Sequence, residues 1–347
     1  MRTLRVRTIM LRKSWFKEGV APMVDTTGDI RRAKLFDVLS ANLQFVKKDP
    51  RVHLEPNIEE GVICPLCFKL FTRESLSREF DDHLTLEDVP PSSLGGKPRT
   101  LTCKICNNWA GTELEADLAN KLRSDEVLKG LSAGRIETRF MPGEGIDLAA
   151  RSSITSERII VRYDPERSDP SQIEKLHRLE ESGEIGEITL KFLLRYRINR
   201  PEIALIRIAY LMAFSRFGYG FLMNANLLPV RSQIQRSDKT ILPDWGILPG
   251  NLPDEALGVN IIYSPQELQS YLVVFDLRTA NSTTRYGVVL PGPSYPGSNI
   301  YFELAKLRSA KEPVTVTYSI RGIPDDSYVS REELAFASHH YWEASRS

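Results

Sequence analysis

A chain of 347 residues is long enough for about two domains with a proper hydrophobic core. Its composition, 41% hydrophobic and 26% charged, is ordinary for a soluble globular protein. The formal net charge of +1 argues against a uniformly basic nucleic-acid binder, although it leaves room for a local basic face. No apolar run reaches the roughly 18 residues that a membrane-spanning helix needs, so we expect no membrane partner.

Residues 1–60 predict a short strand followed by a helix. The first seventeen residues contain six basic side chains and no acidic one, which would also suit an organellar transit peptide. We favour a strand at Thr3–Leu11 with basic flanks, and therefore a cytoplasmic protein. Apolar residues between Asp29 and Val46 recur at roughly helical spacing, which predicts a helix that packs on the rest of the chain.

All four cysteines of the chain lie in two C-x-x-C pairs, and each pair can direct two sulfurs at one ion. This pattern predicts one structural zinc site with four thiolate ligands, Cys64, Cys67, Cys103 and Cys106. Two disulfides or four unrelated buried thiols are the alternatives. The absence of a recognisable signal peptide argues against an oxidising compartment and therefore against disulfides.

Residues 61–124 form the predicted zinc module, which is a treble-clef-like ββα unit. Strands are expected at Leu84–Val89 and Arg99–Thr102, because the prolines and glycines between them favour a loop. Thr112 and Glu115 have the spacing of a capping box, which predicts that the helix starts there.

Residues 125–347 predict a larger, mixed α+β domain, which makes the fold class α+β. Helical patterns cover 170–181, 201–217 and 331–342, and the second of these is apolar nearly all round, as expected of a buried helix. Strand-like runs are expected at 135–140, 157–163, 187–196, 259–263, 271–277, 285–290 and 314–319. The sequence does not decide whether this domain selects a substrate or docks a protein partner.

Three motifs in the zinc module resemble the HNH endonuclease family, the zinc-stapled branch of the ββα-metal nucleases. They are the knuckle C-P-L-C, the segment L-T-L-E-D-V-P-P-S-S-L-G-G-K and the joint L-T-C-K-I-C-N-N-x-x-G. The resemblance covers about 60 residues, and each motif is specific only in combination with the others. It implies a metal-dependent endonuclease that hydrolyses phosphodiester bonds in DNA or RNA, with DNA the first expectation and bacterial defence a role by analogy.

The resemblance also implies site residues. Glu87 falls on the acidic ligand of the catalytic cation, and Asn107, directly after Cys106, falls on the ligand at the start of the helix. Asp88 stands where the family has its general-base histidine, so it is expected to act as the base or as a second carboxylate ligand. Oxygen ligands of this kind suit Mg²⁺ or Mn²⁺. His83, five residues before Asp88, is a candidate substitute base, with a plain loop residue as the alternative.

Basic residues near this site are candidates for contact with nucleic-acid phosphates. They are Lys97, Arg99 and Lys104, for which a solvated loop is the alternative. A second group of arginines, interleaved with tyrosines, could line a groove or make ordinary surface ion pairs; it comprises Arg195, Arg197, Arg200, Arg207, Arg216, Arg231 and Arg236.

Two rival functions stay open on the sequence alone. Loss of the base histidine would suit a non-catalytic zinc module that binds nucleic acid or protein, because an aspartate with a reference pKa near 4 is a weak base at neutral pH. Alternatively, the chain is a nuclease subunit that becomes active only within a complex.

Overall fold

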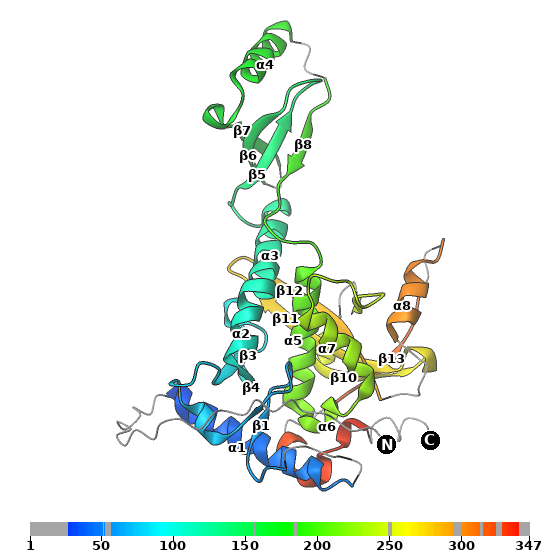
Figure 1. The fold of residues 1–347 in the computed structure, drawn as a ribbon. Coiled ribbons are helices and arrows are strands. Elements are labelled where there is room, and N and C mark those ends of the chain that lie inside the picture. The colour runs from blue at the N-terminus through cyan, green and yellow to red at the C-terminus, as the bar shows by residue number, and fades with distance from the viewer. Residues whose placement is uncertain are drawn as a thin grey trace. The chain divides into compact units, whose positions relative to one another are not determined.

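The computed structural model describes residues 27–50, 52, 57–155, 157–183, 186–248, 252–293, 300–312, 315–323 and 328–339. The fold is mixed α+β, as predicted, and it divides into two compact units (Figure 1). Unit 1 takes the described residues of Met1–Glu115, Glu202–Leu277 and Thr284–Ser347, and unit 2 takes those of Ala116–Pro201 and Arg278–Thr283. Segments distant in sequence therefore share unit 1. The strand expected at Thr3–Leu11 lies outside the described residues.

Two small hairpins and one long helix make the N-terminal part of unit 1. Strands β1 (Val62–Ile63) and β2 (Leu70–Phe71) pair antiparallel, and so do β3 (Leu84–Asp88) and β4 (Pro98–Cys103). Helix α1 (Thr27–Lys47) confirms the predicted helix, and its Arg32 donates a hydrogen bond of 3.2 Å to the carbonyl of Leu84. This bond ties α1 to the β3–β4 hairpin.

The loop between β3 and β4 depends on its glycines. Gly95 has a φ of 87°, a left-handed conformation that glycine adopts without a steric penalty. A Cβ on Gly96 would lie 1.5 Å from the carbonyl oxygen of Pro90, so only glycine lets the two backbone segments approach so closely. The Gly-Gly pair therefore closes the hairpin, as the sequence predicted.

The helix after β4 begins earlier than expected. Helix α2 (Lys104–Ala110) starts directly after Cys103, and a π-helical turn (Gly111–Glu115) leads into α3 (Ala116–Leu128). The predicted capping box is wrong, because the Thr112 hydroxyl donates to the carbonyls of Asn108 and Trp109 in the preceding turn. Thr112 thus lies inside a helical stretch that the second cysteine pair has already started.

Helix α5 (Arg200–Phe217) is the buried helix of unit 1, as its apolar sequence predicted. The short helices α6 (Tyr219–Leu222) and α7 (Leu228–Gln235) follow it. A five-stranded sheet, with the order β13-β10-β11-β12-β9, completes the unit. Its strands are β9 (Ile247–Leu248), β10 (Gly258–Ser264), β11 (Ser270–Arg278), β12 (Thr283–Pro291) and β13 (Ser319–Gly322), and helix α8 (Ile300–Arg308) follows β12.

Unit 2 contains a four-stranded antiparallel sheet with the order β7-β6-β5-β8. Its strands are β5 (Ile136–Met141), β6 (Leu148–Ile154), β7 (Ile159–Tyr163) and β8 (Thr189–Phe192). Helix α4 (Pro170–Ser182) is capped by Asp169, whose side chain accepts a hydrogen bond from the amide of Ser171. Leu176 of α4 packs with Ile146 and Leu148 in a small core.

The strands and the last helix predicted after residue 125 are confirmed in part. Six of the seven predicted strand runs after residue 125 overlap observed strands closely or in part. The run 314–319 is wrong apart from its last residue, because β13 begins at Ser319. In the described part of 331–342 the predicted helix is confirmed only in part, since a single 3₁₀ turn (Glu332–Leu334) precedes α-helical residues 337–339. Among the described residues, no helix is both long and apolar enough to cross a bilayer.

Candidate metal centre and buried ion-pair network

The four cysteines converge at one point in unit 1. Cys64 and Cys67 lie in the turn between β1 and β2, Cys103 ends β4, and Cys106 lies in the first turn of α2. Their Sγ atoms all lie within 4.8 Å of one another, and those of Cys67 and Cys103 are 3.7 Å apart. Tetrahedral zinc with bonds of about 2.3 Å requires sulfur–sulfur separations of roughly 3.8 Å. The cluster therefore fits a single metal ion such as zinc.

The backbone of the first knuckle is bent to aim its sulfurs. The amide of Phe68 donates to the carbonyl of Cys64 at 2.9 Å, and the amide of Cys64 donates to the carbonyl of Lys69 at 2.9 Å. Phe68 has a φ of 61°, which is uncommon for a bulky residue and marks a tightly determined turn. From the second pair, the amide of Cys103 donates to Cys64 Sγ at 3.5 Å. This bond favours a thiolate at Cys64.

The thiols influence one another strongly. The pKa of Cys67 is lowered because Cys103, Cys106 and Cys64 offer it hydrogen bonds. The pKa of Cys103 is raised because it shares hydrogen bonds with the other three sulfurs and is also desolvated. Without a metal ion, the four thiols therefore cannot all be deprotonated, and they share the remaining protons through hydrogen bonds. A divalent cation would neutralise four thiolates instead, which explains why such a cluster favours metal.

Side chains from a distant part of the chain hold the first knuckle in place. The Tyr210 hydroxyl of α5 donates to the carbonyl of Pro65 at 3.0 Å. Tyr219 of α6 accepts from the amide of Ile63 at 2.8 Å and donates to the carbonyl of the same residue at 3.0 Å. The Arg231 guanidinium of α7 lies 3.6 Å from the centre of the Phe68 ring. The knuckle is therefore part of the core of unit 1, which the sequence did not predict.

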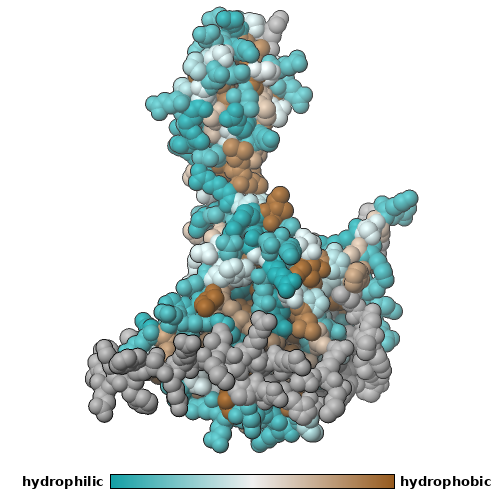
Figure 2. Space-filling model, viewed as in Figure 1, coloured by the Kyte–Doolittle hydropathy of each residue, from teal (hydrophilic) through white to brown (hydrophobic). Residues whose placement is uncertain are grey.

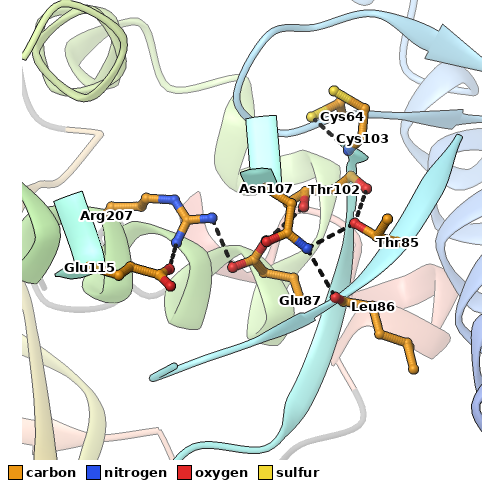
Figure 3. A network of polar contacts seen from close by, with 9 residues as sticks. All are labelled: Cys64, Thr85, Leu86, Glu87, Thr102, Cys103, Asn107, Glu115 and Arg207. Carbon is orange, nitrogen blue, oxygen red and sulfur yellow. Dashed lines mark hydrogen bonds and ion pairs between the residues drawn. The ribbon is translucent and has the colours of Figure 1, made fainter. Parts of the chain in front are cut away.

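A second network lies beside the cysteines, on the face of the β3–β4 hairpin that carries Glu87 (Figure 3). Both carboxylate oxygens of Glu87 accept hydrogen bonds. Oε2 accepts from the hydroxyl of Thr102 at 2.6 Å, and Oε1 accepts from Nη2 of Arg207 at 2.7 Å. The side chains of Glu87 and Arg207 are only 2% and 1% exposed, so this ion pair is fully buried.

The guanidinium of Arg207 also binds a second carboxylate. Its Nη1 donates to Oε1 of Glu115 at 2.7 Å. Glu115 closes the π-helical turn, and insertions of this kind re-aim side chains and are frequent at functional sites. Burial raises the pKa of Glu115, with a further contribution from the nearby Glu87, although Arg207 opposes the shift. The carboxylates of Glu87 and Glu115 thus share one buried cation, which is the guanidinium of Arg207.

Asn107 lies on the same side of the hairpin as Glu87 (Figure 3). Its amide nitrogen donates to the Thr85 hydroxyl at 2.9 Å and to the carbonyl of Leu86 at 3.3 Å. The structure therefore brings together Glu87 and Asn107, as the resemblance implied. It adds Glu115 and Arg207, which the sequence did not assign to this site.

This arrangement does not fit a hard divalent cation while Arg207 is in place. Mg²⁺ binds carboxylate oxygens at about 2.0–2.1 Å and prefers six oxygen ligands. Glu87 already uses both oxygens for Thr102 and Arg207, and the guanidinium would repel a metal ion at the same position. Arg207 thus supplies the positive charge that faces Glu87 and Glu115.

The two remaining predicted catalytic residues, Asp88 and His83, make no hydrogen bond with the described residues of this network. Asp88 is partly exposed, and burial raises its pKa, with a smaller contribution from Glu87 and an opposing hydrogen bond from Ser92. His83 is buried, and its Nδ1 lies 2.8 Å from the carbonyl oxygen of Phe80. Four residues of extended chain, about 13 Å, separate His83 from Glu87. It is thus distant from the network.

The basic residues predicted to meet phosphates lie at the edges of the module. Lys97 and Arg99 are exposed, although the Nε of Arg99 also donates to the carbonyl of Val89 at 3.1 Å. Lys104 is half-buried, and its amide donates to the carbonyl of His83. Arg207, by contrast, is buried, so both alternatives for it, a groove-lining cation and a surface ion pair, are wrong.

Comparison of the chain with protein-family models, with curated proteins and with solved structures finds no match.

Proposed function

We propose that this chain is a zinc-stabilised, HNH-like module that binds nucleic acid without cleaving it. The observation that carries the proposal is the buried ion pair of 2.7 Å between Arg207 and Glu87. In the family that the sequence resembles, the position of Glu87 holds the catalytic cation. Here an arginine side chain takes that charge, and it makes a second ion pair of 2.7 Å with Glu115.

The position of Asp88 supports the same conclusion independently. Hydrolysis of a phosphodiester needs a cation to neutralise charge on the phosphate and a base to activate water. Asp88 stands where the family has a histidine, and its pKa, although raised by burial, starts from about 3.8. The site therefore offers neither a free place for a catalytic cation nor a strong base at neutral pH.

A nucleic-acid target is proposed from the resemblance and from the exposed Lys97 and Arg99. The test incubates the zinc-loaded protein with plasmid, single-stranded DNA and RNA in Mg²⁺ or Mn²⁺. We expect bound complexes and no cleavage. Cleavage that chelation of Mg²⁺ or Mn²⁺ abolishes, and that is lost in Glu87→Ala with zinc content unchanged, would overturn the proposal.

The second candidate is a metal-dependent HNH-type endonuclease acting on DNA or RNA, with bacterial defence as its setting. It is favoured by the position of Glu87 and Asn107 on one face of the hairpin (Figure 3). This candidate requires Arg207 to leave Glu87, which binding of a protein or nucleic-acid partner would have to drive. Cleavage that appears only after a partner is added, and that Asp88→Ala removes, would support it.

A further inference from the structure

The sheet of unit 2 has one face that no part of the function described so far uses. In an antiparallel sheet, residues directly opposite each other point to the same face. Arg151 of β6 lies opposite Glu137 of β5 and Arg162 of β7. Arg139 of β5 lies opposite Lys191 of β8. All four strands therefore contribute to a single face that carries four basic residues; we call it the basic sheet face.

The opposite face of the same sheet is already occupied. Phe140, Leu148 and Tyr163 point away from the basic sheet face, because they alternate with its residues along the strands. They pack with Ile173, Leu176 and Leu179 of α4. The helix thus covers the apolar side, and the charged side is left for solvent or a partner. On the side seen in Figure 2, the surface over this sheet and α4 is largely hydrophilic.

The charges of the basic sheet face are only partly neutralised within the protein. Arg151, Arg162 and Lys191 are exposed, and they make no ion pair with any residue that the structure describes. Arg139 pairs with Asp147 at 2.8 Å. Two further arginines, Arg167 and Arg195, reach Glu137 at 3.4 and 2.7 Å. Asp164, two residues after Arg162 in extended backbone, donates its amide to the carbonyl of Ala149 and adds a third acidic group beside this face. Six basic residues against three acidic ones leave a net charge of +3 on or beside it.

The whole of unit 2 is not basic, so this charge is segregated. Helix α4 carries three acidic residues, Glu174, Glu180 and Glu181, against the basic Lys175 and Arg178, so its formal charge is −1. A net positive charge on the sheet and a slightly negative helix give the unit two faces of different character. Such an arrangement attracts a polyanion to one side only.

The residue types on the basic sheet face favour double-stranded over single-stranded nucleic acid. Its residues on the four strands, from Glu137 to Lys191, include no aromatic side chain, so it offers no stacking platform for the bases of a single strand. Three inter-strand steps of about 4.8 Å separate β7 from β8, and Lys191 lies two residues, about 7 Å, further along the strands than Arg162, so the Cα atoms of these two cations are roughly 16 Å apart. This span exceeds the width of about 12 Å of the major groove of B-DNA by a few ångströms, so long cationic side chains on it can reach the phosphates that line both rims of the groove.

We propose that the basic sheet face binds the phosphate backbone of double-stranded DNA, with Arg151, Arg162 and Lys191 as its principal contacts. This inference rests on the proposed function, since it names the surface through which the chain holds nucleic acid. It moves the main binding surface away from the zinc module and into unit 2. Because phosphate contacts carry little sequence information, the binding would be largely independent of sequence.

The experiment measures binding of a short DNA duplex by fluorescence anisotropy, using the full zinc-loaded chain without added Mg²⁺ or Mn²⁺. The test variant is Arg151→Glu/Arg162→Glu/Lys191→Glu. We expect affinity to fall on the order of 100-fold at physiological ionic strength. The slope of log K against log salt should fall by about 3, because each phosphate contact contributes roughly 0.9. The neutral variant Arg151→Gln/Arg162→Gln/Lys191→Gln should show the same change in slope with a smaller loss of affinity.

A matched control changes the net charge equally at exposed sites of unit 2 outside the basic sheet face: Lys129→Glu/Lys175→Glu/Arg178→Glu. It should keep most of the affinity and the full salt slope. Thermal melts of all variants check that they fold. A neutral variant with unchanged slope would overturn the inference even where the glutamate variant unfolds.

The outcomes separate this inference from the proposed function. If the wild type binds duplex DNA but the control loses as much affinity as the test variant, the inference is overturned and the proposed function stands. If only Lys97→Glu/Arg99→Glu/Lys104→Glu abolishes binding, the zinc module is the binding surface and the inference is again overturned. Tighter binding to single strands or to phosphatidylserine vesicles would overturn the choice of partner. No binding to any nucleic acid would overturn both proposals.

Discussion

Replacing Arg207 by methionine tests whether this side chain acts as the cation of the buried network. The substitution keeps an unbranched side chain in α5, shorter than that of arginine, and removes the charge. Glu87 then lies in the core with its bond to Thr102 but without its ionic partner, and Glu115 loses the same partner. Removal of one member of a buried ion pair typically costs 3–5 kcal/mol, because the remaining charge stays desolvated.

We therefore expect Arg207→Met to lower the free energy of unfolding of unit 1 by about 3–5 kcal/mol. At roughly 2–4 °C per kcal/mol for a unit of this size, the melting temperature should fall by roughly 6–20 °C. Denaturant and thermal unfolding of the zinc-loaded protein measure the change. The control is Arg331→Met, which removes an ion pair with Glu333 whose side chains are 48% and 62% exposed. Exposed pairs contribute about 0–1 kcal/mol, so this control should stay close to wild type.

The pH dependence of the variant gives a second, independent reading. In the folded wild type the pKa of Glu115 is raised above its ordinary value by burial. For an acid with a raised folded-state pKa, the stabilising contribution is fully present below the unfolded pKa of about 4.5 and is lost as the pH rises through the folded value. Without Arg207 this pKa should rise further. The deficit of Arg207→Met should therefore be largest at neutral pH and shrink towards pH 4.5.

Metal binding decides between the two candidate functions. If Arg207 occupies the place of a cation, millimolar Mn²⁺ should leave the melting temperature of the wild type unchanged. In Arg207→Met the freed carboxylates should bind Mn²⁺, and an ion at 100 times its dissociation constant stabilises by about 2.7 kcal/mol. If Arg207→Met without added metal lowers the free energy of unfolding by less than about 1 kcal/mol, the buried-cation argument is refuted. A Mn²⁺-dependent rise in the wild type that Glu87→Gln abolishes would instead favour the endonuclease.

Three further predictions concern the metal, the hairpin loop and unit 2. Cys64→Ser should lose zinc, measured by native mass spectrometry, and should unfold the knuckle, because structural zinc contributes on the order of 10 kcal/mol. Gly96→Ala should lower the free energy of unfolding, measured with denaturant, by about 2 kcal/mol or more, because its Cβ would overlap the backbone of Pro90. The control is Gly186→Ala at an exposed position with open space at its Cβ. Glu126→Gln should destabilise unit 2 by about 1–3 kcal/mol at neutral pH. Hydrogen bonds from residues 279–282 lower the pKa of Glu126 despite its burial, so its contribution is present above about pH 4.5 and is lost as the pH falls; a deficit that persists in acid would contradict this assignment.

The features that the sequence predicted well are those set by residues close together in the chain. The spacing of the cysteines within each pair fixes two local turns, and the converging sulfurs follow from them. Helix α1 follows from its apolar period, and α5 from a long apolar run that begins at a proline. The β3–β4 hairpin follows from two strand-like runs around a Pro- and Gly-rich loop.

The features that the sequence did not predict depend on contacts between distant segments. The boundaries of the two units could not be found from composition, because unit 1 is assembled from three separated stretches of chain. The helix after Cys103 was placed too late, because the capping-box pattern at Thr112 suggested a start that the preceding helical turn overrides. The knuckle contacts of Tyr210 and Tyr219 join residues about 150 positions apart.

Arg207 shows most clearly why pattern alone was insufficient at the candidate site. In the sequence it interrupts an apolar helix, and a lone arginine there fits a groove-lining cation, a surface ion pair or a buried partner equally well. The choice depends on Glu87, which lies 120 positions earlier, and on Glu115, which the π-helical turn aims at the same place. A buried arginine is costly unless carboxylates compensate it, so an arginine inside an otherwise apolar helix indicates that acidic groups must meet it in the core. Here the acidic residue that meets it stands at the position where the family resemblance places a metal ligand. The positive charge that faces these two carboxylates is thus part of the covalent chain.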